Sequence, residues 1–283
     1  MSSAPTTLVS ADQVATHLDN PDWVLVDCRH DLANPEFGRA AYADGHLPGA
    51  RFLHMDEELS GPRTGQNGRH PLPDPKLLAK RLGEIGIDSS KQVVAYDDAG
   101  GMYAARLWWL LNWLGHRNVA VLDGGMHAWR RHAGKLSKTP VTAPATEFVP
   151  RQQAIAVPLE DVVSEHGSPR MLIIDARSPD RFRGENETID PVGGHIPGAV
   201  NRFFKDNLGP DGQFKSPEQL RAEFAALLDG RDPSLVVHQC GSGVTACHNV
   251  LAMEIAGLPG TRLYPGSWSE WCACDARPVA TGQ

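Results

Sequence analysis

One cysteine of the chain stands where a nucleophile could work. Cys240 follows the strand candidate 235–239 and opens the sequence Cys240-Gly-Ser-Gly-Val-Thr245, after which residues 246–256 have a helical pattern. Glycines allow positive φ angles, so backbone N–H groups can point inward as a nest for an anion, and a helix N-terminus adds partial positive charge. Both features favour the thiolate, the nucleophilic form of cysteine. The pattern predicts a reactive cysteine at the carboxyl end of a strand, and a buried structural cysteine is the alternative.

The elements around this cysteine occur twice. Residues 23–29 match 171–177, 45–50 match 194–199, 92–97 match 235–240, and 123–129 match 265–271, with offsets of about 142 to 149 residues. A repeat of that length in constant order indicates a duplicated domain. We predict an N-terminal domain over residues 1–138, a linker over 139–156 and a catalytic C-terminal domain over 157–283. The first copy has Asp97 at the position of Cys240, so we expect it to be non-catalytic.

Each copy alternates short apolar runs with amphipathic segments. Runs such as 172–174 and 235–237 are typical of strands buried on both faces of a parallel sheet. Helices are expected over 76–85 and 218–228, because Asp74-Pro75 and Ser216-Pro217 each place a capping residue before a proline, and Gln219 completes a capping box. This order predicts an α/β fold of two domains, each a mostly parallel sheet flanked by helices. Ligands of such sheets bind at the carboxyl ends of the strands, where Cys240 is expected.

Composition excludes several classes of protein. The 283 residues carry a formal charge of −7, which argues against nucleic acid as the main partner. No apolar run reaches the roughly 18 residues of a membrane span, and the N-terminus lacks a basic and an apolar signal region, so no membrane partner and a cytoplasmic location are expected. Five cysteines in a chain of this size do not indicate a disulfide scaffold.

Three motifs together resemble the tandem-domain rhodanese family of sulfurtransferases. Tyr42-Ala-Asp-Gly-His-Leu-Pro-Gly-Ala50 is similar to its N-terminal signature, and Tyr264-Pro-Gly-Ser-Trp-Ser-Glu-Trp271 to its C-terminal one. The six-residue loop from Cys240 to Thr245 resembles that of the 3-mercaptopyruvate sulfurtransferase branch. The similarity runs from about Leu8 to about Pro278 and implies a pair of α/β domains.

The resemblance implies transfer of sulfur through a persulfide on Cys240, from 3-mercaptopyruvate to a thiol, thioredoxin or cyanide, without metal or organic cofactor. Gly241, Gly243, Val244 and Thr245 would line the substrate. In the thiosulfate branch the two residues after the cysteine are typically basic, whereas Gly241 and Ser242 are neutral, which favours mercaptopyruvate. Members of that branch use a serine, a histidine and an aspartate in catalysis. By motif these would be Ser242, His70 and Asp56.

The donor carboxylate would be bound by an arginine. By the resemblance this is Arg183, with Arg181 as the neighbouring competitor. A second arginine of the branch is missing, since its position falls roughly at Thr188, and Arg202 is one candidate replacement. Arg177 recurs as Arg29 in the other copy, so we expect a structural ion pair there.

Other readings remain open. Phosphatases with a similar cysteine loop need an arginine six residues after the cysteine, where this chain has Ala246, so that activity is disfavoured. Transfer from thiosulfate to cyanide is the alternative within the family. A non-catalytic binding or sulfur-relay module is the alternative outside enzymes. Cys272-Ala-Cys274 lacks a second pair of metal ligands at a suitable spacing, so we predict no metal site there.

Overall fold

A computed structural model describes residues 4–132 and 134–283, and in these ranges no helix is long and apolar enough to cross a membrane. The chain forms two compact units. Unit 1 contains residues up to Gly61, Pro73–Gln153 and Asp211–Gln213. Unit 2 contains Pro62–Leu72, Ala154–Pro210 and Phe214–Gln283. The segment Pro62–Leu72 therefore belongs to unit 2, although it precedes helix α3 (Pro75–Glu84) of unit 1 in the sequence.

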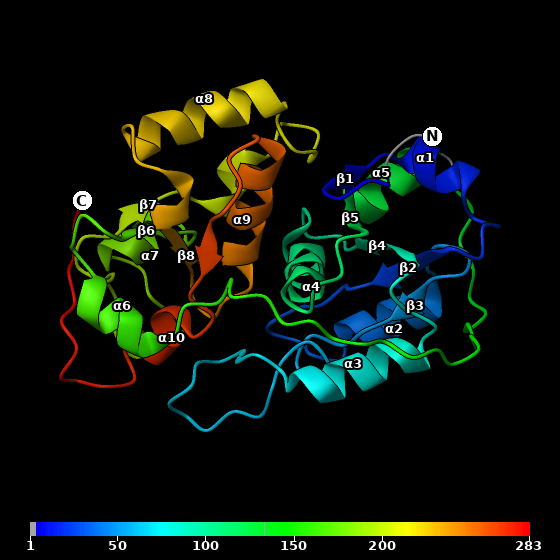
Figure 1. Ribbon diagram of the computed structural model, residues 1–283, viewed down its shortest axis with the longest axis horizontal. Helices are drawn as coiled ribbons and strands as arrows, with labels where there is room; N and C mark the ends of the chain where they lie inside the picture. The colour runs from blue at the N-terminus through cyan, green and yellow to red at the C-terminus, as the bar shows by residue number, and fades with distance from the viewer. Residues whose placement is uncertain (1–3, 133) are drawn as a thin grey trace. The chain divides into compact units, whose positions relative to one another are not determined.

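Unit 1 is built on a five-stranded parallel sheet (Figure 1). Its strand order is β1 (Leu8–Val9), β5 (Val119–Leu122), β4 (Gln92–Tyr96), β2 (Trp23–Asp27) and β3 (Arg51–Phe52). The helices are α1 (Ala11–Thr16), α2 (Phe37–Asp44), α3 (Pro75–Glu84), α4 (Met102–Trp113) and α5 (Gly125–Arg131).

Unit 2 repeats the plan with a four-stranded parallel sheet. The order is β7 (Val200–Asn201), β6 (Leu172–Asp175), β8 (Val236–Gln239) and β9 (Arg262–Leu263). Its α-helices are α6 (Leu159–Glu165), α7 (Pro179–Arg183), α8 (Pro217–Leu228), α9 (Thr245–Ile255) and α10 (Ser267–Trp271), with 3-10 turns η1 (Phe204–Asn207) and η2 (Pro233–Leu235). Two parallel sheets flanked by helices confirm the predicted fold class.

The predicted helix starts are present. Asp74 caps α3 by accepting bonds from the N–H groups of Lys76 and Leu77. Ser216 and Gln219 form the capping box of α8. The strand before Cys240 is shorter than expected, because Leu235 ends η2 and β8 begins one residue later. The cause is Asp232, whose carboxylate caps that turn at Ser234 N–H.

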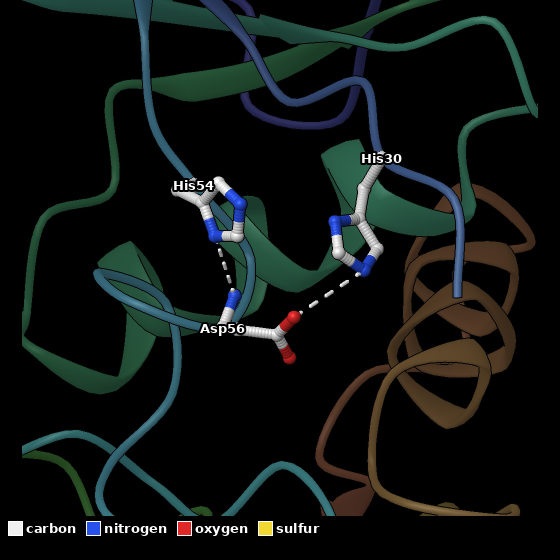
Figure 2. A group of neighbouring side chains, drawn as sticks. All are labelled: His30, His54 and Asp56. Atoms are coloured by element: carbon white, nitrogen blue, oxygen red, sulfur yellow. Dashed lines mark hydrogen bonds and ion pairs between the residues drawn. The ribbon is translucent and has the colours of Figure 1, made fainter. Parts of the chain in front are cut away.

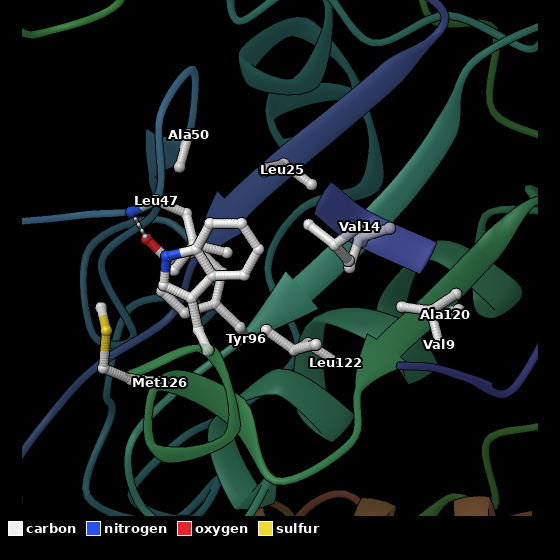
Figure 3. Packing of buried hydrophobic residues seen from close by; sticks show 11 residues of the cluster. Val9, Val14, Leu25, Leu47, Ala50, Tyr96, Ala120, Leu122 and Met126 are labelled. Atoms are coloured by element: carbon white, nitrogen blue, oxygen red, sulfur yellow. Dashed lines mark hydrogen bonds between the residues drawn. The ribbon is translucent and has the colours of Figure 1, made fainter. Parts of the chain in front are cut away.

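The sheet of unit 1 is covered by a continuous apolar cluster that includes Leu25, Val94, Leu122 and Trp129 (Figure 3). Tyr96 is its polar member. The Tyr96 hydroxyl accepts a bond from Leu47 N–H at 3.2 Å and donates one to Asp27 at 2.8 Å. Both polar requirements of this buried ring are thus met inside the core.

The features shared by both copies are structural. Arg29 pairs with Asp27 and donates to the Gly45 carbonyl, and Arg177 makes the same contacts with Asp175 and Gly194. Each arginine thereby connects the end of a strand to the repeated segment that contains His46 in unit 1 and His195 in unit 2. These two ion pairs confirm the prediction made for Arg29 and Arg177.

A buried histidine of unit 2 should make the fold sensitive to acid. His238 on β8 is fully buried, and no hydrogen-bond partner of either ring nitrogen is found among the described residues. Burial lowers the pKa of His238 from its ordinary value of 6.5 to about 3. Protonation is therefore easier in the unfolded chain, so His238 lowers stability as pH falls from about 6.5 towards 3. At about pH 4.5 the free energy of unfolding is lower by about 3 kcal/mol than at neutral pH.

Replacement of His238 by phenylalanine should remove this part of the pH dependence. The measurement is urea unfolding at about pH 7 and about pH 4.5. The control is His127→Phe, because His127 is exposed and should leave the loss between the two pH values unchanged. An unaltered pH dependence in His238→Phe would contradict the prediction.

Candidate functional site

The cysteine loop has the predicted surroundings. β8 ends at Gln239, Cys240 follows, and α9 begins at Thr245 after Val244. Cys240 is only 2% exposed, and Gly243 N–H donates to its sulfur over 3.2 Å. Gly243 has φ +77°, and a Cβ atom on it would lie 2.3 Å from the Pro265 carbonyl oxygen, so only glycine fits. The loop is thus shaped to direct backbone N–H toward the sulfur.

Helix α10 holds this loop in place. Ser267 Oγ accepts a bond from Cys240 N–H at 3.1 Å and donates to the Tyr264 carbonyl at 2.9 Å. The N–H groups of Trp268 and Ser269 donate to the carbonyls of Cys240 and Gly241, both at 2.9 Å. Ser267 is fully buried and adopts φ +55°, an uncommon conformation for serine. The C-terminal signature segment therefore fixes the backbone of the cysteine loop.

The first copy shows what such a loop can bind. The Asp97 carboxylate occupies the corresponding position in unit 1 and is fully buried. It accepts hydrogen bonds of 2.8–2.9 Å from the N–H groups of Ala99, Gly101, Tyr103 and Ala104. The nest and the start of α4 thus hold an anion supplied by the chain itself.

Two of the three residues predicted for the relay are in contact. His70 Nδ1 lies 2.7 Å from Ser242 Oγ, and both side chains are buried. His70 belongs to the segment Pro62–Leu72, which is part of unit 2. Asp56 belongs to unit 1, where its carboxylate lies 3.8 Å from His30 Nε2. The pair of Ser242 and His70 can therefore hold or pass a proton beside the cysteine loop.

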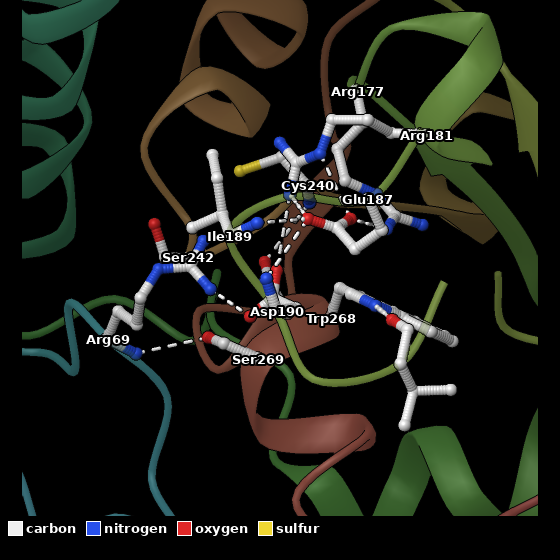
Figure 4. A network of polar contacts seen from close by, with 12 residues as sticks. Arg69, Arg177, Arg181, Glu187, Ile189, Asp190, Cys240, Ser242, Trp268 and Ser269 are labelled. Carbon is white, nitrogen blue, oxygen red and sulfur yellow. Dashed lines mark hydrogen bonds and ion pairs between the residues drawn. The ribbon is translucent and has the colours of Figure 1, made fainter. Parts of the chain in front are cut away.

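Charged side chains also gather at this loop (Figure 4). A Cβ atom on Gly241 would lie 2.8 Å from Nη2 of Arg69 and 3.7 Å from Nη2 of Arg181. Both guanidinium groups bind the carboxylate of Asp190. Glu187 pairs with Arg181 at 2.9 Å and lies 3.6 Å from Arg177. Of these residues, Arg69, Glu187 and Asp190 were not predicted from the sequence, and the position of Arg69 next to His70 was the only local signal.

The other predicted cations lie elsewhere in unit 2. Arg183 forms a two-pronged ion pair with Glu185 and lines a separate pocket of about 310 Å³, together with residues such as Asn201 and Gln283. Arg202 pairs with Glu223 and lies over the ring of Phe224. Thr188, at the position of the missing arginine, is exposed. Of the arginines considered from the sequence for the donor carboxylate, Arg181 is the one that lies beside the loop.

A cluster of His30, His54 and Asp56 in unit 1 has the composition of a metal site (Figure 2). His54 Nδ1 accepts bonds from the N–H groups of Asp56 and Glu57, at 3.1 and 3.3 Å. His54 Nε2 lies 3.0 Å from the Pro35 carbonyl. Both ring nitrogens are thus used by the backbone, and we assign His54 to the support of this turn.

The remaining cysteines are free thiols. Cys247 on α9 is fully buried, and its sulfur donates to the Gly243 carbonyl at 3.3 Å. Burial raises the pKa of Cys272 to about 11, which makes it a poor nucleophile. Cys274 is partly exposed and lies outside the cysteine loop.

Known proteins are similar over the whole chain. A family model described as the rhodanese-like domain matches twice, at residues 10–132 and 159–274. A probable 3-mercaptopyruvate sulfurtransferase from Pseudomonas aeruginosa is 48% identical over 285 aligned residues, covering 100% of both chains. A putative thiosulfate sulfurtransferase from Mycobacterium tuberculosis is 36% identical, covering 97% of both.

Among solved structures, the 3-mercaptopyruvate sulfurtransferase from Leishmania major superposes with a TM-score of 0.86. It is 31% identical, and the match covers 97% of this chain and 76% of that one. A cysteine loop at a strand end, two copies of one α/β domain and these full-length similarities lead to one conclusion. The chain is an enzyme of the rhodanese family of sulfurtransferases and belongs with the 3-mercaptopyruvate sulfurtransferase branch.

Proposed function

We propose that the enzyme moves sulfur from 3-mercaptopyruvate to a thiol acceptor through a persulfide on Cys240. The observation that carries this proposal is the neutral cysteine loop whose Ser242 hydroxyl lies 2.7 Å from His70. Removal of sulfur from mercaptopyruvate leaves a carbanion-like centre that must gain a proton. A serine–histidine pair beside the nucleophile suits that requirement.

In the first half-reaction the Cys240 thiolate attacks the thiol sulfur of the donor. An S–S bond forms, the C–S bond breaks, and its electron pair stays on carbon as the enolate of pyruvate. The proton lost from Cys240 balances the one that this carbon gains, so the products are a Cys240 persulfide and pyruvate. Ser242 and His70 would polarise the donor carbonyl and deliver the proton. That Asp56 supports His70 in this step is a prediction from the family resemblance.

In the second half-reaction an acceptor attacks the outer sulfur and Cys240 leaves as the thiolate. Cyanide would yield thiocyanate. A dithiol such as reduced thioredoxin would become a disulfide and release the sulfur as hydrogen sulfide, so electrons balance. The five free cysteines suit a reducing compartment, and the cytoplasm is the location we propose.

The loop and Arg181 would bind the donor. Gly243 N–H donates to the Cys240 sulfur, and the corresponding loop of unit 1 holds the Asp97 carboxylate with four backbone N–H groups. The donor carboxylate needs a cation, and the Arg181 guanidinium lies directly against Gly241. We therefore propose Arg181 for the role predicted for Arg183, whose guanidinium pairs with Glu185.

Thiosulfate is the second candidate donor, and one observation favours it. Arg69 and Arg181 both lie beside Gly241, where cations could hold a dianion. Asp190 and Glu187, however, already neutralise these arginines. Thiosulfate also requires no proton on its leaving group, so Ser242 and His70 would have no proton to deliver. We rank mercaptopyruvate first for both reasons.

A side-by-side measurement of kcat/KM tests the donor. One arm uses 3-mercaptopyruvate with a thiol acceptor, the other thiosulfate with cyanide. We expect a preference for mercaptopyruvate of about tenfold or more, equivalent to about 1.4 kcal/mol in the transition state. A preference for thiosulfate would overturn the proposed donor and leave the family assignment intact.

A further inference from the structure

Asp190 is a buried carboxylate that holds two arginines beside the reactive cysteine. Only 3% of its side chain is exposed, against 23% for Arg69 and 18% for Arg181. One carboxylate oxygen binds Nη1 of Arg69, and the other lies 3.2 Å from Nη2 of Arg181. This is the pattern by which two guanidinium groups would bind the carboxylate of a small ligand.

The charges of this group cancel. Arg69, Arg177 and Arg181 face three carboxylates, those of Asp175, Glu187 and Asp190. Asp175 is committed to Arg177, with bonds of 2.6 to 3.1 Å. The Glu187 carboxylate accepts hydrogen bonds from Arg181 and from the N–H groups of Ile189 and Asp190. Asp190 is the carboxylate that bridges Arg69 to Arg181.

Of the two acids beside Arg181, Asp190 has the surroundings that favour its charged form less. Burial would raise the pKa of Glu187, but its hydrogen bonds from Arg181 and the backbone bring it below the usual range. Burial raises the pKa of Asp190, and Arg69 and Arg181 offset this only in part. Asp190 lies in a segment without helix or strand, and the neighbouring Thr188 and Ile189 are exposed. Segments outside helices and strands open more readily than those elements do.

We propose that Asp190 is an internal carboxylate that occupies the donor's carboxylate position between Arg69 and Arg181, and that a donor binds by replacing it. Arg69 then acts as the second donor-binding arginine, the one for which the sequence has only Thr188. The inference rests on the proposed function for the identity of the donor, a small carboxylate with a transferable sulfur. It explains how a site with two arginines stays selective for a monoanion, because only one negative charge is exchanged for another.

The first test measures charge at the loop without sulfur transfer. Cys240 is alkylated with iodoacetate, an anion, and with iodoacetamide, its neutral analogue, and both rates are followed on the Cys240 peptide by mass spectrometry. Asp190→Asn should raise the ratio of the iodoacetate to the iodoacetamide rate about tenfold, since both arginines lose their internal partner. Arg69→Met should lower the ratio. Glu185→Gln removes an exposed acid from the same segment and should leave it unchanged.

The second test measures donor binding. Asp190→Asn should lower the KM for 3-mercaptopyruvate several-fold with little change in kcat, and raise kcat/KM for thiosulfate about tenfold. Arg69→Met should raise the mercaptopyruvate KM about tenfold or more. Asp190→Asn keeps Arg69 in place, so the test remains decisive if Arg69→Met fails to fold.

The outcomes separate the two proposals. Unchanged alkylation ratio and unchanged KM in Asp190→Asn would overturn the role of Asp190, whatever the donor. Equal changes in both alkylation rates would show a purely structural role and would also overturn it. A shifted ratio in an enzyme that does not use mercaptopyruvate would leave the anion site standing and refute the proposed donor.

Discussion

Cys240→Ser is expected to lose all sulfur transfer from either donor, with residual turnover at least about four orders of magnitude below the native enzyme. Serine keeps the size of the side chain, but its hydroxyl is not ionised near neutral pH and cannot form the S–S bond. The measurement is intact-protein mass spectrometry after treatment with donor and removal of excess reagent. The native chain should gain the mass of one sulfur atom, and the variant should gain none.

Cys274→Ser is the matched control, because Cys274 is a free, partly exposed thiol outside the loop. That variant should keep both the added sulfur and the turnover. Sulfur retained on Cys240→Ser would place the persulfide on another cysteine. A native chain that gains no sulfur from any donor would favour the alternative of a non-catalytic module.

Much of the fold could be predicted because local physical rules determined it. The starts of α3 and α8 follow from a capping residue before a proline, and the strand before Cys240 follows from a continuous apolar run. The repeated motifs identified Arg29 and Arg177 as structural, since a contact made in both halves cannot depend on the cysteine. These inferences need only near neighbours in the sequence or a comparison of the two halves.

The charge arrangement of the site could not be predicted in the same way. Arg181 and Arg183 are two residues apart on α7, and sequence alone does not show which of them is directed at Gly241. Arg69 and Asp190 are 121 residues apart, so their pairing depends on the path of the segment Pro62–Leu72. A missing arginine was visible at Thr188, but the sequence did not show that Arg69 of a distant segment lies beside Gly241.

Ser242→Ala and His70→Asn should each lower kcat for 3-mercaptopyruvate by about 10² to 10³. Each substitution removes one side of the 2.7 Å contact through which a proton would reach the leaving group. Because both act in one step, the double variant should be little slower than either single variant. Steady-state kinetics of the three variants, with pyruvate release as the readout, measures this coupling.

A structural role for His70 predicts a different pattern. If His70 only supported the loop, transfer from thiosulfate would fall with transfer from mercaptopyruvate. If His70 moves a proton, the thiosulfate reaction should change by less than about threefold, because its leaving group needs no proton on carbon. The iodoacetamide rate at Cys240 serves as the control for an intact loop.

Asp56→Asn extends the test to the third predicted member of the relay. A loss of kcat confined to mercaptopyruvate would place Asp56 in the same relay as His70. An equal loss of kcat with both donors would assign Asp56 to the support of unit 1.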